Sequence, residues 1–99
     1  MTPALRRRVS ERPLLILLDL DGTLSPIVPR PEFAIVPHAS QRVLCGLAAL
    51  PGAHVAIITG RGVEDARRLV CVDAVWIIGN HGLEIAPPNR PATPRDHVA

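Results

Sequence analysis

The chain of 99 residues contains no lysine and no tyrosine, and only 2% of its residues are aromatic. It also lacks a long apolar run behind its basic start. After Arg6–Arg8 the uninterrupted apolar run is Leu14–Leu18, and Asp19 closes it. A secretory core needs about 7–15 apolar residues and a membrane span about 20. These lengths exclude both kinds of segment, so we expect a cytoplasmic protein that does not bind a membrane.

The chain has two cysteines, Cys45 and Cys71, which are too few for a disulfide framework or a zinc site. Both fall in apolar helical segments, so we expect buried free thiols. The net charge of +2 is too small to indicate a nucleic-acid partner. A nucleic-acid arm at Arg6–Arg8 is the alternative, and a solvated tail is the simpler interpretation. A hydrophobic content of 47% in this length allows one small domain and excludes two.

Three apolar segments are typical of buried strands, and two segments with helical spacing separate them. The strands are expected at Leu14–Leu20, Ala53–Thr59 and Ala74–Ile78, with a short one at Leu83–Ala86, and the helices from His38 or Ala39 to Leu50 and at Val63–Val70. This order predicts an α/β fold with an open, doubly wound parallel sheet of the Rossmann type. The core is incomplete, with about three strands and two helices.

Two packing expectations come from the same patterns. Leu14–Leu20 is apolar at nearly every position, which is typical of a central strand with helices over both faces. The first helix has one apolar face that is expected to pack on the sheet, formed by Val43, Leu44, Leu47 and Ala48. We expect residues 1–12 to be a disordered tail, residues 13–86 to be the core, and the proline-rich residues 87–99 to be a tail or linker.

Each predicted strand ends in a polar or glycine-rich turn. The turns are DLDGT at residues 19–23, TGR at residues 59–61 and GNHG at residues 79–82. In open α/β sheets, ligands bind just beyond the carboxyl ends of the strands. We therefore expect the three turns to converge on one edge of the sheet, although they lie far apart in the sequence.

The first turn places two carboxylates, Asp19 and Asp21, at the end of a buried strand. Carboxylates held close together recruit a cation, and oxygen ligands of this kind suit Mg²⁺. A carboxylate neutralised by Mg²⁺ can attack an anionic electrophile, and a second acid can protonate the leaving group and later activate water. Gly22 permits a sharp turn whose amides can face a phosphate. The alternative is an Asp-Gly turn with two solvated acids.

The segment DLDGTL at residues 19–24 resembles the first motif of the haloacid dehalogenase-like phosphatases. That resemblance implies that Asp19 forms an aspartyl-phosphate, that Asp21 is the general acid and base, and that both lie at a Mg²⁺ site. Thr59 stands where the second motif of that superfamily places a hydroxyl on the phosphoryl group. The residues expected to bind phosphate are Gly22, Thr23, Thr59, Gly60 and Arg61.

Within that superfamily, LSPI at residues 24–27, TGR at 59–61 and GNHGLE at 79–84 resemble the trehalose-6-phosphate phosphatases in order and spacing. The resemblance covers about residues 13–86. It implies Mg²⁺-dependent hydrolysis of trehalose 6-phosphate, a small sugar phosphate, to trehalose and phosphate. The residues expected to contact the sugar are Asn80, His81 and Glu84. Structural alternatives stay open: a plain strand residue at 59, a surface arginine at 61 and a simple turn at 80–81.

The family pattern also has a later lysine or arginine that offsets charge, and an acidic pair that completes the Mg²⁺ shell. This chain has no lysine, and its late candidates, Arg90, Arg95 and Asp96, lie in the proline-rich segment. We therefore expect the N-terminal part of a phosphatase that is weakly active or inactive alone. An unpaired apolar edge on the first strand predicts marginal stability or self-association. The alternatives are a phosphatase for another small phosphate ester and a catalytically dead module that pairs through its open sheet edge.

Overall fold

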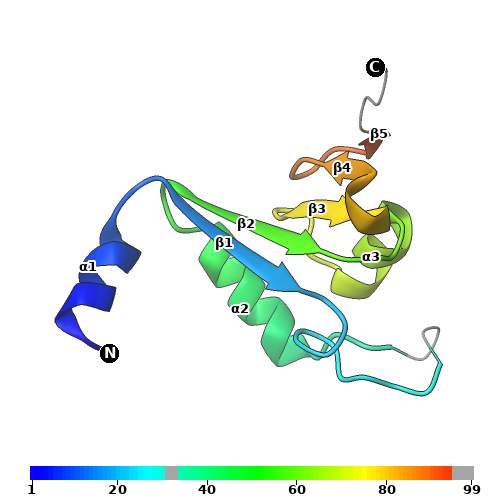
Figure 1. The fold of residues 1–99 in the computed structure, drawn as a ribbon, viewed down its shortest axis with the longest axis horizontal. Helices are drawn as coiled ribbons and strands as arrows, with labels where there is room; N and C mark the ends of the chain where they lie inside the picture. Colours follow the sequence, from blue (N-terminus) through cyan, green and yellow to red (C-terminus); the bar gives the residue numbers. More distant parts are fainter. Residues whose placement is uncertain (31–33, 95–99) are drawn as a thin grey trace.

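The computed structural model describes residues 1–30 and 34–94 of the chain. Its elements in chain order (Figure 1) are α1 (Pro3–Ser10), β1 (Leu14–Asp19), α2 (His38–Ala48), β2 (Ala53–Ile58), α3 (Val63–Val70), β3 (Trp76–Gly79), the three-residue turn η2 (Asn80–Gly82), β4 (Glu84–Ala86) and β5 (Thr93–Pro94). Over these two ranges, no helix has the length and apolar character needed to cross a bilayer.

The strands form one five-stranded sheet in the order β1-β2-β3-β4-β5. The first three strands are parallel, with Leu18 beside Ile57 and Ile57 beside Ile77. β3, β4 and β5 then run antiparallel. Two helical crossovers between parallel strands confirm the predicted α/β, Rossmann-like core, and the antiparallel strands add a small meander to it.

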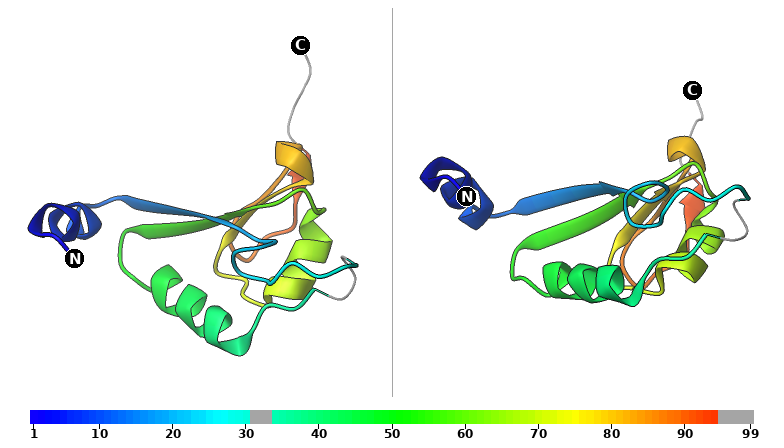
Figure 2. Two further views of the ribbon diagram at one scale, coloured as in Figure 1. Left: turned by 60° about the horizontal axis from the view of Figure 1, so that its bottom comes forward. Right: turned by 90° about the horizontal axis from the view of Figure 1, so that it is seen from below.

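Helices α2 and α3 lie on the same face of the sheet (Figure 2). The strand residues of that face are Ile16, Leu18, Val55, Ile57 and Ile77. They share one apolar core with residues of both helices, including the fully buried Leu44 and Val70. Because both crossovers step in the same direction along the sheet, right-handed connections place both helices on one side.

The opposite face of β1 is open in the described part of the chain. Leu15 is 61% exposed and Leu17 53% exposed, whereas Ile16 and Leu18 between them pack on the core. The sequence predicted helices over both faces of this strand. In the described part of the chain, helices cover only one face. A strand that is apolar on both sides and bare on one is an unusual surface for a soluble domain.

Three side chains differ from their predicted burial. Val43 is 60% exposed, because α2 contacts the sheet through a narrower stripe centred on Leu44. Cys45 and Cys71 are free thiols, as expected, but both are exposed rather than buried. Cys71 ends α3 in a left-handed conformation with φ of 56°, and its Sγ donates to the carbonyl of Arg68 at 3.1 Å, which turns it away from the core.

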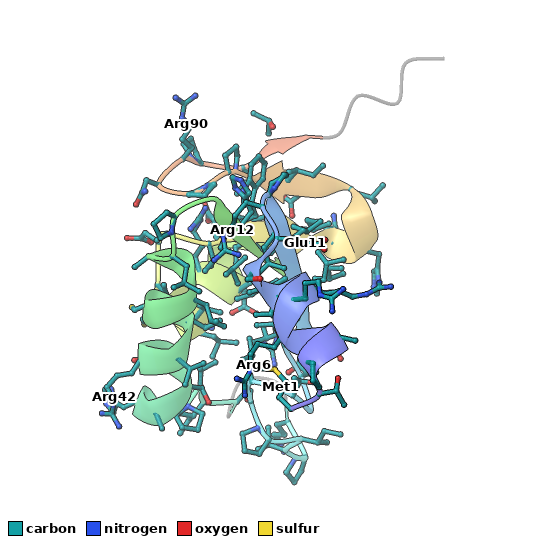
Figure 3. All side chains as sticks on the ribbon, turned by 90° about the vertical axis from the view of Figure 1, so that its left-hand side faces the viewer. Met1, Arg6, Glu11, Arg12, Arg42 and Arg90 are labelled. Atoms are coloured by element: carbon teal, nitrogen blue, oxygen red, sulfur yellow. The ribbon has the colours of Figure 1, made fainter. Side chains whose placement is uncertain are left out.

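Residues 1–12, expected to be a disordered tail, contain the helix α1. Thr2 caps this helix by accepting a hydrogen bond from the N–H of Leu5 at 3.1 Å, and none of its residues is buried. Arg12 joins it to the body, since Nε donates to the carbonyl of Pro51 at 2.7 Å and Nη1 to that of Val9 at 2.8 Å. Figures 1 and 2 show α1 apart from the sheet, and Figure 3 labels Met1 and Arg6 at this end of the chain.

The proline-rich segment was expected to carry no core contacts, and its described part does carry some. β5 pairs with β4 through Ile85 and Thr93, and Ala92 packs against the core. β3 begins at Trp76 rather than Ala74, because the carbonyl of Asp73 is turned to accept the N–H of Asn89 at 2.8 Å. Arg95 and Asp96 lie outside the described residues.

Candidate active site

The carboxyl ends of the three parallel strands meet at one edge of the sheet. Asp19 at the end of β1 is in register with Ile58 at the end of β2, and Ile58 is in register with Ile78 in β3. The following loops are joined by the N–H of Asn80, which donates to the carbonyl of Arg61 at 2.6 Å. The predicted convergence of the three turns is therefore confirmed.

The loop after β1 is a tight turn whose backbone N–H groups converge on the carbonyl of Leu20. The carbonyl of the fully buried Leu20 accepts the N–H groups of Leu24 and Ser25, each at 3.0 Å. Gly22 has φ of 88°, a conformation that favours glycine, and its N–H donates to the carbonyl of Ser25 at 2.6 Å. The N–H of Thr23 points to the carbonyl of Leu20 at 3.4 Å. The two amides expected to face a phosphate thus close their own loop here.

Arg61 donates hydrogen bonds to two carboxylates at this edge, Asp21 and Asp65. Its Nε and Nη2 donate to the two carboxylate oxygens of Asp21 at 3.1 and 2.9 Å, a bidentate pair across 40 residues of sequence. Its Nη1 donates to Oδ2 of Asp65 at 2.9 Å. The guanidinium group lies in a half-buried position, with the side chain 12% exposed and Asp21 46% exposed.

The charges of this cluster stabilise one another. The hydrogen bonds to Asp21 raise the pKa of Arg61 above its already high ordinary value. The hydrogen bond from Arg61, followed by that from Arg68, lowers the pKa of Asp65 below 3.8. Arg68 lies one turn further along α3 and forms a short ion pair with the other oxygen of Asp65. Asp65 is therefore a carboxylate held between two arginines at neutral pH.

Thr59 lies at the start of the loop after β2, and only 5% of it is exposed. Its Oγ1 accepts the backbone N–H of Arg61 at 3.1 Å. A hydroxyl that already accepts one hydrogen bond keeps its own proton for donation. The arrangement leaves Thr59 able to donate to an anion at this edge, as the second motif requires.

The backbone of the GNHG turn is strained at Asn80 and His81. Asn80 and His81 both have positive φ, at 50° and 55°, which residues other than glycine rarely adopt. The ring of His81 lies over Gly60, where an added Cβ would stand 2.6 Å from Cε1 of the ring. A side chain at position 60 would therefore require the exposed ring of His81 to move.

Glu84 was expected to contact a sugar, and in the structure its carboxylate contacts the start of α3. Oε1 accepts the N–H of Val63 at 3.4 Å. A carboxylate at a helix N-terminus is favoured by the partial positive charge there. Glu84 thus links β4 to α3, behind the loop that carries Arg61.

The donor set at this edge fits Mg²⁺ in part. The carboxylate of Asp19 is exposed and has no ion-pair partner in the described ranges, whereas both oxygens of Asp21 are occupied by Arg61. Among residues 1–30 and 34–94, no three His, Cys, Asp or Glu side chains gather as a metal cluster. Mg²⁺ is commonly held by one or two carboxylates with water and substrate phosphate as further ligands, so Asp19 is a suitable first ligand.

The hollow at the edge is small. It has a volume of about 350 Å³ and is lined by Asp21, Ile27, Val28, Gly60 and Arg61. A larger hollow of about 700 Å³ lies between α3 and the β4–β5 hairpin, away from both aspartates. Of the residues that can handle a phosphate, Asp21 and Arg61 line the smaller one.

Comparison with known proteins decides the family. A family model described as trehalose-phosphatase matches residues 17–95 of the chain. The chain belongs to the trehalose-phosphatase family. It is 39% identical over 75 residues to trehalose-phosphate phosphatase B of Arabidopsis thaliana, which covers 76% of this chain and 20% of that protein.

Two further relatives show how far the similarity reaches. An uncharacterized glycosyl hydrolase of Mycobacterium tuberculosis is 42% identical over 85 residues, or 86% of this chain and 6% of that protein. The C-terminal domain of the trehalose-6-phosphate phosphatase of C. albicans superposes with a TM-score of 0.80 at 29% identity, covering 93% of this chain and 32% of that one. The chain thus spans a third or less of the length of these trehalose-phosphatase relatives.

Asp65 belongs to this edge of the sheet, although the sequence pattern did not place it there. Asp65 reads as an acid in the first turn of a helix, where the helix dipole favours it. The structure shows that it also holds Arg61, four residues earlier. The i,i+4 spacing of an acid and a base was the available signal, and it was hidden because Arg61 precedes the helix and lies in its N-terminal loop.

Proposed function

We propose that this chain carries the phosphoryl-transfer edge of a phosphatase that hydrolyses trehalose 6-phosphate to trehalose and phosphate. The observation that carries the proposal is the meeting of Asp19, the Asp21–Arg61 pair and Thr59 at one edge of a sheet whose family is that of the trehalose-phosphatases. A charged sugar phosphate does not cross a bilayer unaided, so we place the reaction in the cytoplasm.

Asp19 is the proposed nucleophile. Its exposed carboxylate oxygen forms a bond to phosphorus while the bond from phosphorus to the sugar oxygen breaks. Thr59 donates its free proton to a phosphoryl oxygen. Mg²⁺ bound at Asp19 would offset the negative charge that otherwise keeps a carboxylate and a phosphate apart. The product of this step is an aspartyl-phosphate on Asp19 and an alcohol that needs a proton.

Asp21 is the proposed acid and base. It gives its proton to the departing sugar oxygen, then takes one from the water that attacks the aspartyl-phosphate. Attack by that water releases inorganic phosphate and restores the carboxylate of Asp19. Asp21 lies two residues beyond the nucleophile on the same tight loop, which supports both roles.

The sugar side of the site is proposed at the GNHG turn. Asn80 and His81 are exposed there, in strained backbone beside Gly60, and both offer hydrogen-bonding side chains to hydroxyl groups. Glu84 supports this turn from behind through the N-terminus of α3. Substrate choice between trehalose 6-phosphate and other small phosphate esters would depend on this turn.

The test is phosphate release from trehalose 6-phosphate and from an aryl phosphate, with Mg²⁺ and with a chelator, comparing the chain with Asp19→Asn. The expected result is weak, Mg²⁺-dependent release from the sugar ester that the variant loses. Release from the aryl ester alone would reject the sugar and keep the phosphatase. Equal release from both proteins would reject Asp19 as the nucleophile.

A second candidate is an interaction module that pairs through β1. Its support is the open edge of that strand together with the exposed Leu15 and Leu17 on its bare face. The expected result is a dimer or larger species by light scattering at micromolar concentration, which Leu17→Asp returns to a monomer. A monomer at all concentrations would reject this candidate.

A further inference from the structure

Arg61 divides its donors between two acids. The Nε–Nη2 edge of the guanidinium group faces Asp21, and Nη1 faces Asp65. Asp65 is fixed in turn by Arg68 from the next turn of α3. One end of Arg61 is thus attached to a helix, and the other holds an exposed carboxylate on a loop.

The first contact occupies the edge that a phosphate would need. Both carboxylate oxygens of Asp21 accept hydrogen bonds from the Nε–Nη2 edge of Arg61. A phosphate presents two oxygens with the spacing of a carboxylate, and a guanidinium edge binds either one bidentately. An arriving phosphate therefore competes with Asp21 for the same edge of Arg61.

We propose that Arg61 exchanges one partner for another when substrate binds, and that Asp65 is its pivot, the partner that it keeps. Asp65 keeps Nη1 while the Nε–Nη2 edge passes from Asp21 to the phosphoryl oxygens as the substrate enters. The exchange binds the phosphate and releases both carboxylate oxygens of Asp21 in the same movement. This inference rests on the proposed function and adds to it a positioning residue that does not touch the substrate.

The pivot and a purely structural role predict opposite changes in anion binding. If Asp65 acts only as a helix-end acid, removing its negative charge beside Arg61 should tighten the binding of an anion. If Asp65 is the pivot, its removal detaches the Nη1 side of Arg61 from α3 and weakens anion binding. Glu64 is the matched control, since it is a neighbouring first-turn acid that is exposed and has no ion pair in the described ranges.

The experiment measures the dissociation constant of inorganic phosphate by calorimetry and the Nε–H resonance of Arg61 by NMR. For Asp65→Ala we expect phosphate binding to weaken about fivefold to tenfold, because the arginine is no longer preorganised. Asp65→Asn, which keeps an oxygen acceptor, should restore most of it, and Glu64→Ala should match the wild type. In the wild type, phosphate should shift the Nε–H resonance, as the edge leaves Asp21.

Three different results would contradict the proposed function, the pivot and the exchange. A folded wild-type chain that binds no phosphate at millimolar concentration overturns the proposed function and the inference together. Phosphate binding that is unchanged or tighter in Asp65→Ala overturns the pivot alone. A Nε–H resonance that does not respond to bound phosphate overturns the exchange, whatever the affinities are.

Discussion

The interior of this molecule and its site edge are held together by different forces. Between the sheet and its two helices, Val55, Ile57 and Ile77 are buried among aliphatic side chains. At the carboxyl edge, the loops are joined by hydrogen bonds, by the ion pairs of Arg61 and by strained backbone at Asn80 and His81. Apolar burial is worth far more than exposed ion pairs, so stability resides in the first region and chemistry in the second.

The difference between the regions teaches where a substitution will be felt. A change in the core should lower the free energy of unfolding and leave the site geometry intact in the molecules that remain folded. A change at the edge should do the reverse. The bare face of β1 belongs to neither region. An apolar residue on that face is therefore a control for substitutions of buried apolar residues in the same sheet.

The largest effect is expected from Ile57→Ala. Ile57 is fully buried at the centre of the sheet, so its truncation should cost about 2–4 kcal/mol of unfolding free energy. Leu17→Ala, on the bare face of β1 at 53% exposure, should cost less than about 0.5 kcal/mol. Urea unfolding of both variants measures the contrast. An equal loss in both would mean that another surface covers the bare face in solution.

A middle-sized effect is expected from Gly79→Ala, where the interior meets the edge. An added Cβ at this position would stand 2.8 Å from the carbonyl of Arg61, a backbone atom fixed by its hydrogen bond from Asn80. The expected cost is about 1–3 kcal/mol by urea unfolding. Gly60→Ala is the matched control, because its Cβ meets the exposed ring of His81, which can rotate away. A larger cost at position 60 than at position 79 would contradict this account.

Patterns along the chain were enough to predict the parallel core and the gathering of its polar turns. Val63–Val70 is a helix within its predicted bounds, because the glycines before it and the two acids of its first turn are local signals. The partner of Arg61 could not be predicted in the same way. Asp21 lies 40 residues away, and no local rule states which of several acids at one edge an arginine will choose.

The direction of side chains also required the structure. Val43 satisfies the helical spacing of a buried face and is exposed, because α2 buries only the narrow stripe centred on Leu44. Glu84 stands in a motif that resembles a sugar contact, and the sequence did not predict that its carboxylate also reaches the start of α3. Which face of β1 would be bare depends on the direction of two crossovers, and hydropathy does not carry that information.

The smallest effect is expected from Asp65→Asn, and its sign depends on pH. Hydrogen bonds from Arg61, and then from Arg68, lower the pKa of Asp65 in the folded chain. The ionised carboxylate therefore stabilises the fold at pH values above 3.8, the ordinary pKa of this group. That stabilisation is lost as the pH falls through the lower folded value. Because the side chain is 38% exposed, we expect about 0.3–0.5 kcal/mol at pH 7.

Urea unfolding of Asp65→Asn and the wild type at pH 7 and near pH 2 measures this difference. It should be small at pH 7 and decrease toward the lower pH, because protonation of the carboxyl group removes its ion pairs with the two arginines. Glu64→Gln, which loses a first-turn acid without an ion pair in the described ranges, separates the helix-dipole contribution from that of the arginines. A loss of several kcal/mol at Asp65 would place the site edge among the structural supports of the fold and end the contrast between the two regions.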